Sequence, residues 1–333
     1  MGGGVKELYM EKFKKYYKKI LLIIAIICIT STYIIGSYFV NFALIAKSGG
    51  ENRPKIALNI EEDKIISKNK KALETQRDKW LAEVKDYTKK ISVSTPDGLR
   101  LIGHTYEQNS PTDKWVIIVH GYQSSENRSK IYGAGFYKLG YNVLTYSLRG
   151  HKPSEGKYIS MGSKDSEDLL AFVNLIIRIN PKSEITLHGT SMGGATVLNA
   201  SGKSLQKNVK TIIDDCGYAD LWKIFQKELK LRFNLPSFPV LYMANVMGNI
   251  KSNITISSIK PIEEVKKSTL PIMFIHTTGD DFVPVSDTYS MYDAKEHGYK
   301  EKYIINGFGH ADAVFADSDY FKKIDAFIKK SSD

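Results

Sequence analysis

One stretch near the middle of the chain, residues 185–195, constrains the fold more than any other. It begins with a short apolar run suited to a buried strand, breaks at Gly-Thr-Ser-Met-Gly (residues 189–193), and continues with small residues that can start a helix. A serine at the apex of a strand–turn–helix unit, with glycine two positions before and two after, is the pattern of a nucleophile elbow. Only small residues fit beside such a turn, because strand and helix approach closely there. Ser191 is therefore the candidate nucleophile, and the rest of the chain must supply its partners.

The composition excludes several other classes of protein. At 333 residues and 42% hydrophobic, the chain can bury a core of ordinary size. Its two cysteines, Cys28 and Cys216, lie far apart, and no His/Cys group has metal-ligand spacing. We therefore expect neither a disulfide scaffold nor a metal site. The net charge of +11 comes without a nucleic-acid-binding motif, so we expect no nucleic-acid partner.

The N-terminal region predicts a membrane anchor. Residues 20–46 carry no charge, and as a helix they would be about 40 Å long, enough to cross a ~30 Å hydrocarbon core with tilt. Six lysines within residues 1–19 outnumber the three basic residues just after the run. The positive-inside rule then places the N-terminus in the cytoplasm and the domain outside. The prediction is a single-pass signal anchor in the cell membrane; a signal peptide cleaved near 43–46 and a buried core helix are the alternatives.

Beyond the anchor, the pattern predicts an α/β domain. Residues 47–60 have the composition of a linker, and 61–90 have the spacing of an amphipathic helix packed on the domain or on the membrane surface. A hairpin is expected over 91–106. Strands are then expected at 115–120, 142–146, 185–188, 211–214, 271–276 and 301–305, with helices between them and at 286–297 and 312–330. All-apolar strands that alternate with helices predict a mostly parallel sheet covered on both faces.

One segment interrupts this alternation. Residues 217–262 are far more than one crossover helix needs, and they are rich in aromatic and apolar side chains. Such a segment is typical of a lid over an acyl or other hydrophobic pocket. An inserted pair of helices that merely packs on the domain is the alternative.

Over residues 91–330 the sequence resembles the α/β-hydrolase family, with its nearest likeness to prolyl-oligopeptidase-like and membrane-anchored bacterial serine hydrolases. The resemblance lies in the order of five motifs. They are His-Gly-Tyr at 120–122, Leu-Arg-Gly-His-Lys-Pro-Ser-Glu-Gly at 148–156, the elbow at 189–193, Gly-Asp-Asp-Phe-Val-Pro at 279–284 and Gly-Phe-Gly-His at 307–310. It implies an α/β-hydrolase domain at 91–333 with a helical lid at 217–262, after a basic cytoplasmic segment (1–19), a transmembrane helix (20–46) and a linker with an amphipathic helix (47–90).

The resemblance also implies a catalytic triad in the chain order Ser, Asp, His that this fold uses. Asp280, three residues before a Val-Pro pair, would orient the imidazole of the base, with its neighbour Asp281 as the rival. His310 would be the base that takes the serine proton. The backbone N–H groups of Met192 and Tyr122 would form the oxyanion hole, which stabilises the charge that develops on the carbonyl oxygen.

These features predict a membrane-anchored serine hydrolase that works through an acyl-enzyme and needs no cofactor or metal. The anchor and the apolar lid favour a small-molecule or lipid-like ester as substrate over a thioester, an amide or a peptide. A prolyl-oligopeptidase-like serine peptidase is the second candidate. A non-catalytic surface binding protein and a non-hydrolytic enzyme on the same fold are further alternatives.

Overall fold

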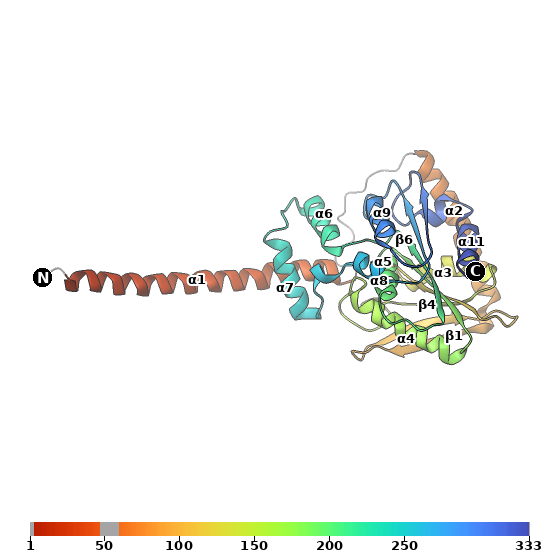
Figure 1. The fold of residues 1–333 in the computed structure, drawn as a ribbon, viewed down its shortest axis with the longest axis horizontal. Coiled ribbons are helices and arrows are strands. Elements are labelled where there is room, and N and C mark those ends of the chain that lie inside the picture. The colour runs from red at the N-terminus through yellow and green to blue at the C-terminus, as the bar shows by residue number, and fades with distance from the viewer. Residues whose placement is uncertain (1–2, 47–59, 333) are drawn as a thin grey trace.

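A computed structural model of the protein describes residues 3–46 and 60–332. Figure 1 shows one long helix, α1 (Gly3–Leu44), that runs away from a rounded domain, with two short helices beside the point where it leaves. Those two helices are α6 (Leu221–Phe233) and α7 (Val240–Ser252). They come from the segment that the sequence assigns to a lid.

The centre of the domain is a sheet that contains eight strands in the described part of the chain. The strand order is β1-β2-β4-β3-β5-β6-β7-β8; β1 and β2 run antiparallel to their neighbours, and the others run parallel. The strands are β1 (Thr88–Ser94), β2 (Arg100–Tyr106), β3 (Lys114–Val119), β4 (Asn142–Tyr146), β5 (Glu184–Thr190), β6 (Val209–Asp215), β7 (Ile272–Thr277) and β8 (Lys300–Ile305). This is the α/β-hydrolase architecture that the sequence predicts.

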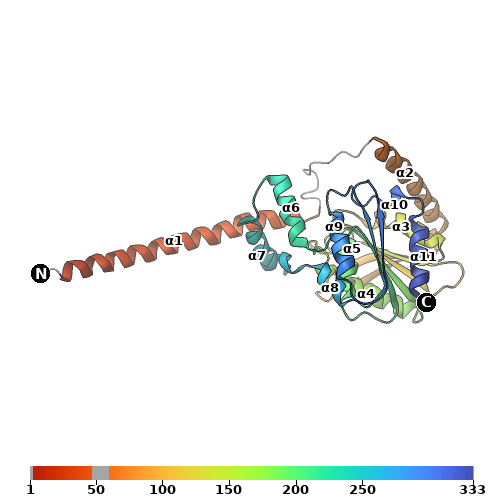
Figure 2. The ribbon, with the colours of Figure 1, turned by 45° about the horizontal axis from the view of Figure 1, so that its top comes forward.

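Helices cover both faces of this sheet, as Figure 2 shows. One face packs against α4 (Ser163–Ile179), α5 (Met192–Ser201), α8 (Pro261–Lys267) and α9 (Val285–Ala294). The other face packs against α2 (Ile60–Glu83), α3 (Glu126–Lys138), α10 (Ala313–Ala316) and α11 (Tyr320–Ser332). Each face therefore has its own hydrophobic core, as expected for strands that are apolar on both sides.

Three predicted helices have different bounds in the structure. The helix expected over 286–297 is α9, which ends at Ala294. The helix expected over 61–90 ends at Glu83, because residues 88–90 pair with β2 and belong to the sheet. The helix expected over 312–330 is two helices, since Asp317 is extended and its carboxylate accepts the N–H of Asp319 just before α11 begins. The linker expected over 47–60 lies almost wholly outside the described residues.

Helix α2 packs on the domain. Its Trp80 is buried, with its ring centre 4.7 Å from that of Tyr106, and Val84 just beyond the helix is buried beside it. Of the two positions that the sequence allows for this helix, the structure therefore places it against the domain.

The C-terminal part of α1 belongs to the domain as well. Val40 and Leu44 are 1% and 0% exposed and lie in the core cluster with α4 and α5. A Cβ atom on Gly36 would lie 2.4 Å from the carbonyl oxygen of Met243 in α7, so the two helix backbones touch there. By length and composition, residues 13–44 suit a membrane span, but the last turns of this helix pack against the domain, and Lys251 of α7 lies 5.7 Å from the ring centre of Tyr33.

Candidate active site

Ser191 lies on the sharp turn between β5 and α5, in a strained backbone conformation with φ 58° and ψ −119°. A Cβ on Gly189 would lie 2.0 Å from the carbonyl oxygen of Gly193, and one on Gly193 would lie 2.1 Å from that of Val119. No side chain fits at either glycine. The Ser191 N–H donates to the carbonyl of Asp215 at 2.7 Å, which ties the turn to β6. The sheet and the helix thus hold the serine at the carboxyl end of the strands.

His310 and Asp280 continue from this serine in a chain of hydrogen bonds. His310 Nε2 lies 2.7 Å from Ser191 Oγ, and His310 Nδ1 lies 2.6 Å from Asp280 Oδ2. A carboxylate can only accept, so Nδ1 carries the proton and Nε2 is left to accept from the serine hydroxyl. This is the geometry that a general base needs.

Asp280, not Asp281, occupies the position of the acid. One carboxylate oxygen of Asp280 accepts the N–H groups of Phe282 and Val283 at 2.8 and 2.9 Å, and the other lies 3.1 Å from Nε2 of His276 as well as near His310. Burial disfavours the charged form, but the two histidines outweigh it and hold the pKa of Asp280 well below its ordinary value. The group therefore stays ionised.

The loop after β3 comes into contact with the elbow. A Cβ on Gly121 would lie 3.2 Å from the Cβ of Ser191. His120 fixes this loop: its Nε2 accepts the N–H of Leu148 at 3.1 Å, so its Nδ1 carries the proton and donates to the carbonyl of Gly121 at 2.9 Å. Burial lowers the pKa of His120 to about 3, so this ring is a neutral structural element. Tyr122 follows on the same loop.

Met192 is the first residue of α5. The first amides of a helix have no partner inside it and suit a developing negative charge. The backbone N–H groups proposed for the oxyanion hole, those of Met192 and Tyr122, thus belong to the two segments that meet at the serine.

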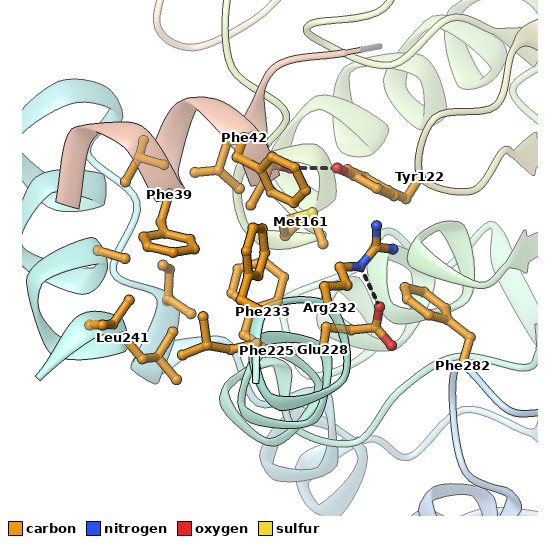
Figure 3. Close-up of a pocket in the computed structure, with 17 residues that line it drawn as sticks. Phe39, Phe42, Tyr122, Met161, Phe225, Glu228, Arg232, Phe233, Leu241 and Phe282 are labelled. Carbon is orange, nitrogen blue, oxygen red and sulfur yellow. Dashed lines mark hydrogen bonds and ion pairs between the residues drawn. The ribbon is translucent and has the colours of Figure 1, made fainter. Parts of the chain in front are cut away.

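Two cavities meet at Tyr122. The first, which we call the site cavity, lies between the loop after β3, the elbow and the loop that carries His310. Most of its lining residues carry a polar group, among them Ser191, His310, Arg128 and Gln123. The second is almost entirely apolar and lies between α1, α6 and α7 (Figure 3). We call it the anchor cavity, because α1 supplies five of its lining residues.

The sequence did not point to two parts of this site. His276, predicted only as the end of a strand, contacts the Asp280 carboxylate; its position four residues before the acid is the one available signal. Phe39 and Phe42 fall within the predicted transmembrane helix, and the structure places both of them in the wall of a cavity.

One group of side chains could be mistaken for a metal site. In the described part of the chain, ligand atoms of Cys216, Asp280 and His310 lie within 4.8 Å of one another. The imidazole and the carboxylate are already hydrogen-bonded to each other, and burial raises the pKa of the Cys216 thiol far above its ordinary value. A protonated thiol is a poor ligand, so these residues fit a triad better than a metal.

The sheet order and the elbow between β5 and α5 define an α/β hydrolase. Residues 110–261 match the family described as "Serine aminopeptidase, S33". The protein YqkD of Bacillus subtilis (strain 168), described as uncharacterized, is 31% identical over 224 residues, which cover 67% of this chain and 73% of YqkD. The chain belongs to this family of α/β hydrolases.

Solved structures show the same fold in enzymes with different substrates. The Pyrococcus furiosus esterase Pf2001 aligns with a TM-score of 0.61 and 24% identity, over 74% of this chain and 93% of the esterase. The Pyrococcus horikoshii acylaminoacyl peptidase aligns with a TM-score of 0.56 and 16% identity, over 73% of this chain and 41% of the peptidase. At these identities the likeness shows the fold alone, so the choice between ester and peptide depends on this chain's own cavities.

Proposed function

We propose that this protein is a membrane-anchored serine hydrolase that cleaves a carboxylic ester through an acyl-enzyme. The observation that carries the proposal is the hydrogen-bonded chain Ser191–His310–Asp280 at a strained elbow. Three side chains from distant parts of the sequence meet in the order and geometry of a triad. A protein that only bound a partner would not need all three.

In the proposed reaction Ser191 Oγ attacks the ester carbonyl while its proton passes to Nε2 of His310. The negative charge that develops on the carbonyl oxygen is met by the N–H groups of Met192 and Tyr122. His310 then gives the proton to the departing alcohol. A water molecule, deprotonated by the same imidazole, attacks the acyl-enzyme and releases the acid. Asp280 keeps the imidazole oriented and stabilises its charged form.

The anchor cavity supports an ester over a peptide. A peptide presents backbone N–H and C=O groups that need hydrogen-bond partners when buried. The walls offer few, since 14 of the 17 lining residues are apolar and Glu228 is paired with Arg232 at 2.8 Å. A serine peptidase is the second candidate, because the matching family is described by that activity.

The proposed location is the cell membrane, with the N-terminus in the cytoplasm and the domain outside. The lysines before the apolar run support this orientation. Retention of the anchor is supported by Val40 and Leu44, because cleavage within 43–46 would remove buried core residues. Protease added to intact cells should digest the domain; complete protection would contradict the orientation.

A fluorophosphonate probe tests the nucleophile. Membranes that contain the full chain should be labelled, and Ser191→Ala should abolish labelling. Ser201→Ala is the matched control, because Ser201 is a buried serine at the end of α5, ten residues after Ser191. Labelling that persists in folded Ser191→Ala, or never appears in folded wild type, would overturn the assignment.

A further inference from the structure

The anchor cavity is an apolar chamber built jointly by the anchor and the lid. Its walls come from the last turns of α1 and from α6 and α7. The ring of Phe233 in α6 lies 5.1 Å, centre to centre, from both Phe39 and Phe42 of α1. Figure 3 shows Leu241 and Phe39 toward one side of the chamber, Phe42 and Phe233 in the middle, and the Arg232–Glu228 pair toward the other side, with Tyr122 and Phe282. One end is therefore hydrocarbon-like and the other is polar.

The polar end lies next to the site cavity, with which it shares Tyr122. Tyr122 lines both the anchor cavity and the site cavity, and it stands in the loop proposed to supply an oxyanion donor. Phe282 also lines the anchor cavity, and its ring centre is 5.0 Å from that of His310. A chain that fills the apolar end can thus place a carbonyl near Ser191 at the junction of the two cavities.

The length of the anchor puts the chamber against the membrane. The uncharged stretch starts at Ile20, and the backbone meets α7 at Gly36. The sixteen residues from Ile20 to Ile35 make about 24 Å of helix, which is less than the ~30 Å hydrocarbon core. No residues of α1 are therefore left over to separate the lid from the bilayer surface.

The outer face of the lid suits that position. Tyr242, Val246 and Ile250 recur every fourth residue along α7 and are 54%, 48% and 69% exposed. Phe238, just before the helix, is 73% exposed, and its ring packs on Tyr242. Such an apolar stripe is unfavourable in water and favourable at the surface of a bilayer.

We propose that the anchor cavity takes the long acyl chain of a membrane amphiphile, which enters from the bilayer beside α7. This proposal rests on the proposed esterase activity and adds its substrate class: an ester of a long-chain fatty acid. The acyl chain lies between α1, α6 and α7, and the head group leaves on the side of the polar site cavity. The anchor thus forms part of the binding site in addition to holding the domain at the membrane.

A chain-length series tests the substrate class. The full chain in detergent is assayed with p-nitrophenyl esters from butyrate to palmitate. Ala43→Phe fills the cavity from α1, and Ala25→Phe makes the same change on an exposed, lipid-facing turn of the same helix. Each methylene excluded from an apolar site costs about fourfold. Ala43→Phe should therefore lower the palmitate-to-butyrate ratio of kcat/KM by more than tenfold, and Ala25→Phe should leave it unchanged.

A cross-linking measurement covers the case in which Ala43→Phe fails to fold. The wild-type chain is treated with a long-chain alkyl fluorophosphonate that carries a diazirine at the end of the chain. Ser191 Oγ bonds to phosphorus, fluoride leaves, and the serine proton passes to His310. Irradiation should then attach the chain end to peptides of α1, α6 or α7. Attachment elsewhere would overturn the proposal.

The outcomes separate this proposal from the proposed function. Loss of the probe reaction and of butyrate hydrolysis in folded wild type would overturn the esterase itself. Butyrate hydrolysis that depends on Ser191, with a chain-length ratio equal in Ala43→Phe and wild type, would overturn only the acyl-chain site.

Discussion

Removal of the last turns of α1 should destabilise the catalytic domain. Two shortened chains test this: one that begins at Ile35 and keeps the packed turns, and one that begins at Lys47 and lacks them. Both lose the free part of the anchor and keep everything after residue 46. The difference between them therefore isolates residues 35–46.

The structure gives the size of the effect. Val40 and Leu44 are fully buried, and each contributes about 1.5–3 kcal/mol by burial. The carbonyls of Ala43, Leu44 and Ile45 accept hydrogen bonds from Tyr122, Ile159 and Gln123, worth about 1 kcal/mol each. The expected loss is about 6–9 kcal/mol, which approaches the whole stability of an ordinary domain, about 5–15 kcal/mol.

Urea unfolding followed by circular dichroism in mild detergent measures this loss, and hydrolysis of p-nitrophenyl butyrate reports on the site. The chain from Ile35 should unfold cooperatively and be active, and the chain from Lys47 should be unfolded or nearly so. Two substitutions in the full chain test the same packing with a smaller effect on stability. Leu44→Ala should lower the free energy of unfolding by about 2–5 kcal/mol. Leu21→Ala, on the exposed part of the helix, should lower it by less than about 0.5 kcal/mol. Stabilities of the two shortened chains within about 1 kcal/mol of each other would refute the reasoning.

Four further predictions concern the site and its support. Asp280→Asn should lower kcat by about 10³–10⁴ with little change in KM, because the imidazole loses its orientation; Asp281→Asn should lower kcat less than tenfold in the same assay. Since two histidines hold the pKa of Asp280 low, its carboxylate contributes stability above its unfolded pKa of about 4 and loses it below. The free energy of unfolding, measured by urea titrations from about pH 5 to about pH 2, should therefore fall more steeply for wild type than for Asp280→Asn. Parallel pH dependences of the two proteins would contradict this. Gly189→Ala should cost at least about 1–3 kcal/mol and most of the activity, because its Cβ would overlap the Gly193 carbonyl; an unchanged melting temperature would argue against the observed turn. Arg149→Met should cost about 3–5 kcal/mol at neutral pH, because it leaves the buried Asp168 carboxylate, now bonded at 2.6 and 2.7 Å, without its partner. That cost should shrink on acidification, since burial raises the pKa of Asp168 to about 6, and a cost independent of pH would count against the buried pair.

The strands of the sheet could be predicted because each buried strand is a short, continuous run of apolar residues. The run at 142–146 is buried at every position and coincides with β4 as the structure has it. The candidate residues Ser191, Asp280 and His310 could be named because each lies in a short motif, and the order of the motifs matches the fold. Their approach to within hydrogen-bond distance depends on the sheet order, which no single motif contains.

The joint between anchor and domain could not be predicted, for a physical reason. A helix in lipid and a helix in a protein core both need apolar side chains, so composition cannot divide residues 20–46 between the two. Gly36 was the available hint, because a glycine lets two helix backbones approach, but its partner α7 lies some two hundred residues further along. The same holds for His276, whose contact with Asp280 depends on the path of the chain after β7.

The packing of Val40 and Leu44 has a consequence for the order of events during synthesis. These residues leave the ribosome among the first fifty, whereas α7, which packs beside them, comes about two hundred residues later. At about 5–20 residues per second, that interval lasts on the order of 10–40 s. In the proposed membrane location, lipid is the apolar surrounding available to the end of α1 throughout that interval. We then expect the domain to complete its core at the membrane surface, where these turns leave the lipid and pack against the newly made lid.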